Sequence, residues 1–298
     1  MNDMTAAQPV AQRFVGAHGN ALVGDMFGPG PGAVLLLHGG GQTRHAWLRT
    51  AQAIAQSGMT AYAVDQRGHG DSDWIDSGAY GFKDYAADAR ALADQLAVRT
   101  GARPTVVGAS LGGIAALIAE GQEAGGGRPP LFGALVLVDI TPRVDYGGIA
   151  KVQGFMRAHA REGFASVAEA ADAVAAYLPH RPRPRSHEGL QKNLRRHEDG
   201  RWRWHWDPRF LESRRPDEAY RALREAALAD AARSLKMPVL LVRGGSSELV
   251  QEDHAKEFLE LVPHASYSDV AGARHMVAGD QNDQFSSAIL DFLNKLNH

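Results

Sequence analysis

Short apolar runs alternate with helix-like segments through the first 140 residues. The apolar runs have the length and continuity of strands buried on both faces of a sheet, and they lie at 33–37, 60–64, 105–107 and 134–138. Amphipathic or Ala-rich stretches between them predict helices near 46–56, 84–98 and 113–119. This alternation predicts parallel strands joined by right-handed crossovers, with helices on both faces of the sheet.

The two ends of the chain extend this pattern. Two short runs, 13–16 and 21–25, flank a His18-Gly19-Asn20 turn and predict an opening hairpin. Strand signals return at 238–242 and 265–270, and an amphipathic helix is predicted from 282 to 296.

The middle of the chain differs, because residues 141–234 contain no apolar strand run. Helix-like stretches in this part cover 144–160, 166–178, 186–198 and 216–233. We therefore predict an α/β fold with a mostly parallel, doubly wound sheet formed by residues 1–140 and 235–298. Residues 141–234 are predicted to form a helical cap inserted between two strands of that sheet.

The composition narrows the function classes. The 298 residues include no cysteine, which excludes disulfides, thiolate nucleophiles and cysteine-based zinc sites. A net charge of −2 gives no reason to expect nucleic acid or an anionic membrane as a partner. No run approaches the roughly 18 apolar residues that span a bilayer, and the first residues lack a signal-peptide pattern. We expect a cytoplasmic protein that binds a small-molecule substrate, with no cofactor or metal; a homo-oligomer stays open.

The sequence Gly108-Ala109-Ser110-Leu111-Gly112 lies between a predicted strand and a predicted helix. A serine on such a sharp turn has a strained backbone and an exposed hydroxyl. Glycines two residues before and after it let the strand and the helix approach closely. Ser110 is therefore the candidate nucleophile, whereas the alternative is a serine in a connecting loop.

A serine nucleophile needs a base and an acid that orients the base. Glu248 follows the predicted strand at 238–242, and His275 follows the one at 265–270. Both therefore lie at the carboxyl edge of the sheet, where ligands bind in open α/β folds. We predict His275 as the base and Glu248 as its orienting acid; Asp139, at the end of the strand at 134–138, is the alternative acid.

An oxyanion needs backbone N–H donors. The N–H of Leu111 is one candidate, and Gly40 in the glycine-rich loop after the third strand is the other. A phosphate-binding loop is the competing interpretation of that loop. The G-x-G-x-x-G pattern fails there, because Arg44 stands where the third glycine is required.

With these motifs the chain resembles the α/β-hydrolase superfamily, and the resemblance covers nearly everything outside residues 141–234. The segments that carry it are His38-Gly39-Gly40, Asp65 to Ser72, Gly108 to Gly113, Arg243-Gly244-Gly245 and Gly272 to His275. The resemblance implies that residues 141–234 are a lid over the active site. Two positions depart from the family pattern: Glu248 stands where Asp is usual, and Arg274 precedes the histidine where Gly is frequent.

The serine also separates this chain from similar epoxide hydrolases and haloalkane dehalogenases, which use Asp as nucleophile. Ser110 favours acyl transfer, so we expect a cofactor-independent serine hydrolase that cleaves a small-to-medium carboxylic ester. The same three residues could serve a lactone, an amide or a carbon–carbon bond next to a ketone. A non-catalytic ligand-binding protein of the same fold is the third possibility.

The predicted cap contains Trp202, Trp204 and Trp206 at alternate positions. In an extended segment these side chains share one face. They would form either a wall of an apolar substrate pocket or the packing of the cap itself. Tyr177 and Met276 are further candidates for the pocket lining.

Overall fold

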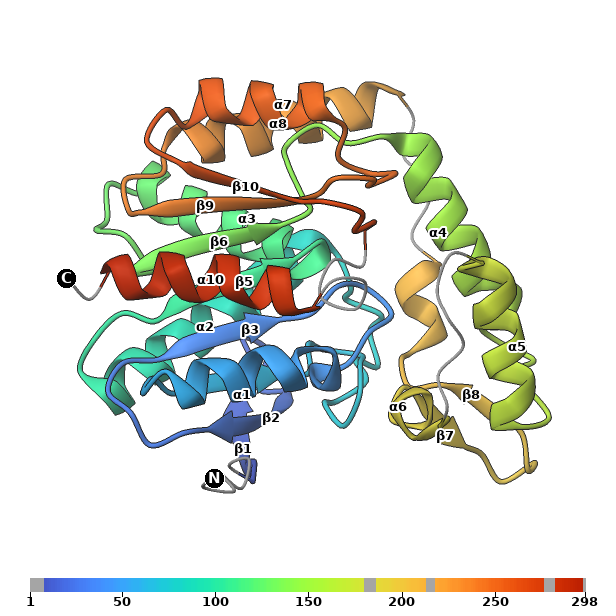
Figure 1. The fold of residues 1–298 in the computed structure, drawn as a ribbon. Helices are drawn as coiled ribbons and strands as arrows, with labels where there is room; N and C mark the ends of the chain where they lie inside the picture. Colours follow the sequence, from blue (N-terminus) through green and yellow to red (C-terminus); the bar gives the residue numbers. More distant parts are fainter. Residues whose placement is uncertain (1–7, 180–185, 213–217, 276–281, 297–298) are drawn as a thin grey trace.

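An eight-stranded sheet lies at the centre of the computed structural model, which describes residues 8–179, 186–212, 218–275 and 282–296 (Figure 1). The strands follow the order β1-β2-β4-β3-β5-β6-β9-β10 across the sheet. Their bounds are β1 Val10–Val15, β2 Ala21–Phe27, β3 Val34–Leu37, β4 Ala61–Val64, β5 Thr105–Ala109, β6 Ala134–Val138, β9 Val239–Gly244 and β10 Ser266–Val270. The β1–β2 and β2–β4 pairs are antiparallel, and all other neighbouring strands are parallel. The predicted hairpin and the mostly parallel sheet are confirmed.

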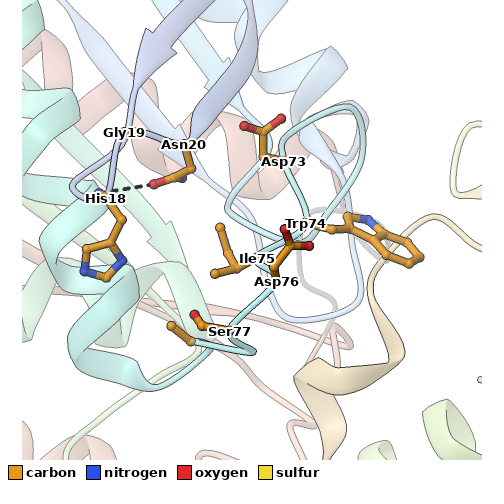
Figure 2. Close-up of a pocket in the computed structure, with 9 residues that line it drawn as sticks. His18, Gly19, Asn20, Asp73, Trp74, Ile75, Asp76 and Ser77 are labelled. Atoms are coloured by element: carbon orange, nitrogen blue, oxygen red, sulfur yellow. Dashed lines mark hydrogen bonds between the residues drawn. The ribbon is translucent and has the colours of Figure 1, made fainter.

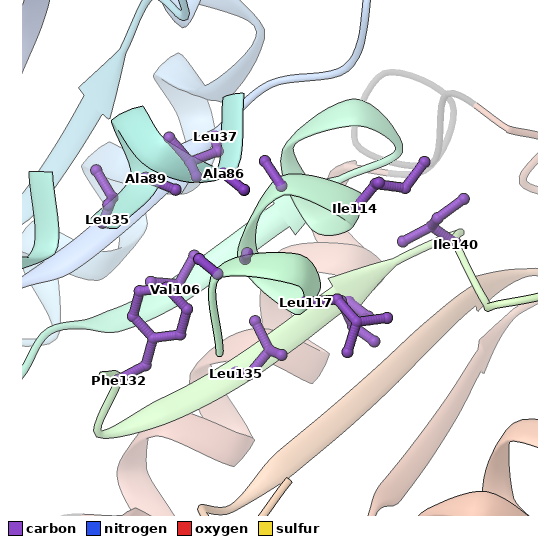
Figure 3. Close-up of a cluster of buried hydrophobic side chains, with 14 of the residues drawn as sticks. Leu35, Leu37, Ala86, Ala89, Val106, Ile114, Leu117, Phe132, Leu135 and Ile140 are labelled. Carbon is purple, nitrogen blue, oxygen red and sulfur yellow. The ribbon is translucent and has the colours of Figure 1, made fainter. Parts of the chain in front are cut away.

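The central strands β3, β4, β5, β6 and β9 are covered on both faces, which explains why they are continuous apolar runs. Leu35 and Leu37 face a core shared with α2 (Phe82–Thr100) and α3 (Leu111–Gly125). Figure 3 shows this side, where Ala86 and Ile114 of the two helices lie over the strands. Leu36 faces the other way, toward α1 (Leu48–Gln56) and α10 (Asn282–Leu296).

The chain leaves the sheet after β6 and returns to it at β9. The elements in between are α4 Tyr146–Ala158, α5 Val167–Tyr177, α6 Glu188–Gln191, β7 Leu194–Arg196, β8 Trp202–Trp204, η2 Pro208–Leu211 and α7 Glu218–Arg233. Helices α4, α5 and α6 and the β7–β8 pair form a layer beside the sheet (Figure 1). This layer has its own apolar cluster, which includes Met156, Phe164 and Trp204.

Helix α7 packs differently from the rest of residues 141–234. Its buried residues Leu228, Ala231 and Ala232 are part of the core on the α2–α3 side of the sheet. A methyl group added at Gly121 of α3 would lie 2.5 Å from Cβ of Ala231, so the two helices are in close contact. Helix α7 therefore covers the sheet together with α3 and α8 (Glu252–Leu261).

The helix predicted over 186–198 is wrong. Only Glu188–Gln191 is helical, and β7 then pairs with β8 in antiparallel register, with Leu194 opposite Trp204. An Asp199-Gly200 turn joins the two strands, and Gly200 has a φ of +80° that glycine adopts without strain. Asp-Gly is a strong hairpin signal, and here it decides the local structure.

Candidate active site

Ser110 lies on a sharp turn between β5 and α3. Its φ of 45° and ψ of −107° place a non-glycine residue in a strained region. The two flanking glycine positions have no room for a side chain. A methyl group at Gly112 would lie 2.4 Å from the carbonyl oxygen of Leu37. A methyl group at Gly108 would lie 2.6 Å from the nitrogen of Gly113. The close packing of strand on helix therefore holds the serine in its strained conformation.

The end of β6 lies directly beside this turn. The Ser110 N–H donates to the carbonyl oxygen of Val138 at 3.2 Å, and Asp139 is the next residue. Asp139 is fully buried and has a φ of 49°, so a second strained residue stands next to the first. Its Oδ2 lies 2.7 Å from Nδ1 of His275. Asp139 and His275 thus meet at the carboxyl edge of the sheet, beside the turn that carries Ser110. Among the described residues, no hydrogen bond joins the Ser110 hydroxyl to the imidazole.

The acid beside the imidazole is Asp139 rather than Glu248, which corrects the predicted placement of Glu248. The Glu248 carboxylate accepts a hydrogen bond from the backbone N–H of His275 at 3.4 Å, and within the described part of the chain it makes no hydrogen bond with the ring. Strand order alone would favour Glu248, because β9 lies beside β10, whose following loop carries His275, and β6 lies one strand farther away. The contact is made instead by Asp139, whose left-handed backbone conformation at the end of β6 accompanies a carboxylate that reaches the ring.

Two further donors hold the Asp139 carboxylate. The Gly244 N–H donates to Oδ1 at 3.0 Å, and the Ser247 hydroxyl donates to Oδ2 at 2.6 Å. Hydrogen bonds to an ionised acceptor are short and strong. Sequence reasoning did not identify Ser247 as part of the site, and its position beside Glu248 in the same loop was the only available signal.

The glycine-rich loop after β3 lies against Ser110. A methyl group at Gly39 would lie 3.6 Å from Cβ of Ser110, and one at Gly40 would lie 3.9 Å from Cδ2 of Leu111. The N–H of Gly39 donates to Gln42 Oε1 at 3.0 Å, and that of Gly41 donates to His69 Nε2 at 3.1 Å. By contrast, the described residues offer no acceptor to the N–H of Gly40 or of Leu111. These two groups are available to a ligand.

Two buried histidines hold this loop. His69 Nε2 accepts from Gly41, while its Nδ1 donates to the carbonyl oxygen of Arg67 at 3.0 Å. His38 Nε2 accepts from the N–H of Gln66 at 3.0 Å. Burial lowers the pKa of His38 to about 4 and that of His69 to about 3. Both rings are therefore neutral near pH 7, as their acceptor roles require.

Side chains from the inserted layer cover the same loop. A methyl group at Gly40 would lie 2.9 Å from Cζ of Phe210, and one at Gly41 would lie 2.5 Å from Cε of Met156. The insertion is also tied to the turn that contains His69, because Gly70 N donates to the carbonyl oxygen of His205 at 2.7 Å. Apolar side chains of the insertion thus lie against Gly40 and Gly41 of this loop.

The predicted pocket residues have different positions. Trp204 is 8% exposed and packs edge-on against Phe155 and Phe164, so it belongs to the interior of the inserted layer. Tyr177 is half-buried and stacks on Phe155 with ring centroids 4.2 Å apart. Burial raises the pKa of Tyr177, and the charge of Glu248 adds to this shift. Met276 lies outside the described residues.

A separate cavity of about 550 Å³ lies elsewhere on the molecule (Figure 2). Its lining comes from the β1–β2 turn, including His18 and Asn20, and from a loop that includes Asp73 and Asp76. Ser110, Asp139 and His275 do not line it.

The described residues contain no group of three His, Asp or Glu side chains suited to a metal ion. None of the described helices is long and apolar enough to cross a membrane.

The strand order, the serine turn after β5 and the insertion after β6 define an α/β hydrolase. A family model described as serine aminopeptidase, S33, matches residues 29–282. The chain belongs to this family of α/β hydrolases, and the resemblance noted in the sequence is confirmed.

Individual relatives agree with this assignment. Esterase Rv0045c of Mycobacterium tuberculosis is 32% identical over 260 residues, which are 83% of this chain and 78% of that protein. 2-(Acetamidomethylene)succinate hydrolase of Mesorhizobium japonicum is 30% identical over 274 residues, which are 89% of each chain. A crystal structure of E-2-(acetamidomethylene)succinate hydrolase has a TM-score of 0.79 at 24% identity, covering 96% of this chain and 100% of that chain.

Proposed function

We propose that the chain is a cofactor-independent serine hydrolase that cleaves a small-to-medium carboxylic ester through an acyl-enzyme. Ser110 is the nucleophile, His275 the general base and Asp139 the acid that orients it. The contact of 2.7 Å between Asp139 Oδ2 and His275 Nδ1, beside a strained serine, carries this proposal. The esterase relative at 32% identity supports the choice of an ester substrate.

The reaction follows from these roles. His275 takes the Ser110 proton as the hydroxyl oxygen attacks the ester carbonyl. The resulting oxyanion accepts hydrogen bonds from the N–H groups of Leu111 and Gly40, the two that have no acceptor among the described residues. His275 then protonates the leaving alcohol, and the acyl group remains on Ser110. In the second half-reaction His275 activates a water, which releases the carboxylic acid and restores the serine.

The inserted layer selects the acyl group in this proposal. Met156 and Phe210 lie over the glycine-rich loop, so the acyl chain enters an apolar space. An acyl-chain-length series of 4-nitrophenyl esters measures the extent of that space.

Amide hydrolysis by the same three residues is the second candidate. It is supported by the description of the family as serine aminopeptidase and by the hydrolase that is 30% identical. Matched 4-nitrophenyl esters and 4-nitroanilides of the same acyl group separate the two activities.

The test of the proposal is the Ser110→Ala variant. Ester turnover is expected to fall by at least about 10³-fold, and a fluorophosphonate probe is expected to label the unaltered protein at Ser110 and not the variant. Ser246→Ala is a matched control, because Ser246 is exposed on a loop and its hydroxyl makes no hydrogen bond with any described residue. Hydrolysis at the rate of the unaltered protein by Ser110→Ala would refute the proposal.

A further inference from the structure

Ser247 occupies a buried position behind the proposed acid. It lies in the loop after β9 and is 5% exposed. Its hydroxyl donates to Asp139 Oδ2 at 2.6 Å, the same oxygen that lies 2.7 Å from His275 Nδ1. One carboxylate oxygen is thus shared between the imidazole and a serine that is not the nucleophile.

The direction of the Ser247 proton follows from its other contacts. The backbone N–H groups of Leu249 and Val250 each donate to Oγ of Ser247 at 3.1 Å. A serine hydroxyl has two lone pairs and a single proton. Because the two amides occupy the lone pairs, the proton is left to point at Asp139. The loop therefore presents Ser247 as a fixed donor rather than a freely rotating hydroxyl.

We infer that Ser247 is a positioning residue for the proposed reaction, acting through Asp139 on His275. Together with the Gly244 N–H at 3.0 Å from Oδ1, it fixes both carboxylate oxygens. The carboxylate is then already oriented when positive charge develops on the imidazole, and no solvent has to reorganise. This inference rests on the proposed serine-hydrolase function.

The first test compares hydroxyl donors at position 247. Ser247→Ala is expected to lower kcat for 4-nitrophenyl butyrate by about 10-fold to 100-fold with little change in KM, as for a lost hydrogen bond to a charged group. Ser247→Cys keeps nearly the same volume but donates weakly, so a similar loss is expected. Ser247→Thr keeps the hydroxyl and is expected to retain most of the activity. Ser246→Ala, one residue earlier, is the matched control and should behave as the unaltered protein.

The second test asks whether Ser247 acts through Asp139. In an Asp139→Asn background, Ser247→Ala is expected to cause almost no further loss of kcat, whereas independent roles would give multiplicative losses. A kcat unchanged in both Ser247→Ala and Ser247→Cys would overturn the inference. So would a full additional loss in the Asp139→Asn background.

These results are separable from a failure of the proposed function. If Ser110→Ala stays active or the fluorophosphonate does not label Ser110, the serine mechanism itself is wrong. If Ser110 and Asp139 are essential and Ser247 is not, only the inference about Ser247 fails. Thermal unfolding of each variant identifies losses that come from an unfolded loop, and Ser247→Thr and Ser247→Cys then decide the case.

Discussion

Asp139→Asn removes one charge and almost no volume from the candidate site. The two carboxylate oxygens of Asp139 receive donors from opposite sides, with Gly244 at Oδ1 and Ser247 and His275 at Oδ2. An asparagine has only one oxygen to offer these donors. If that oxygen faces Gly244, the amide NH₂ meets Nδ1 of His275 and favours the tautomer with its proton on Nε2, which cannot act as the base. If the oxygen faces His275, the NH₂ opposes the Gly244 N–H.

The expected loss is large. The corresponding Asp-to-Asn change in a serine protease, a worked example for this chemistry, lowers kcat by about 10⁴ through the wrong tautomer. We expect a loss of 10³ to 10⁴ here, which corresponds to roughly 4–5.5 kcal/mol of lost transition-state stabilisation. Glu248→Gln is the matched comparison, because it makes the same chemical change one loop away. Its loss is expected to stay below about tenfold, since among the described residues the Glu248 carboxylate makes a hydrogen bond only to the backbone N–H of His275.

The assay measures kcat and KM for 4-nitrophenyl butyrate and the rate of fluorophosphonate labelling in both variants. Labelling reports the activation of Ser110 without requiring the physiological substrate. A larger loss in Glu248→Gln than in Asp139→Asn would refute the assignment of Asp139. It would return the role to the residue that the sequence favoured.

Three further predictions concern the loop and the insertion. Gly40→Ala should lower kcat by about 10²- to 10³-fold, because the added methyl group would lie 2.9 Å from Phe210 Cζ and displace the loop. Adding Phe210→Ala to this variant should partly restore kcat. An equal loss from Gly40→Ala with and without Phe210→Ala would contradict the steric reason. The unfolded state binds more protons than the folded state between pH 6.5 and about 4, because the folded pKa values of His38 and His69 are about 4 and 3. The free energy of unfolding should therefore fall as the pH drops through that window, by about 2 kcal/mol per histidine at pH 5, and urea titrations of His69→Gln should show a weaker pH dependence. Trp204→Ala should lower the free energy of unfolding, measured by urea titration, by about 3–5 kcal/mol, because the side chain is buried. The KM for 4-nitrophenyl acetate should stay nearly constant. An altered KM with unchanged stability would instead show that Trp204 lines the substrate pocket.

The local patterns of the chain determined much of the architecture. Strands β3, β4, β5, β6 and β9 are apolar runs because each is covered on both faces, and that property is visible in the sequence. The serine turn is also local, since Gly108 and Gly112 are demanded by close contacts with neighbours in the chain and with the end of β3. Where two local signals competed, as in residues 186–198, the helical pattern lost to strand pairing across the Asp199-Gly200 turn.

Only the tertiary structure decided which acid meets the histidine. Both Asp139 and Glu248 follow strands that end at the same edge, so chain order alone allowed either. β9, not β6, is the neighbour of β10, yet the Asp139 carboxylate is the one that reaches His275. The loop after β9 brings Ser247 rather than Glu248 to that carboxylate. A contact within hydrogen-bond distance depends on strand order and on single backbone angles. Neither is encoded in the hydrophobic pattern from which the fold itself could be predicted.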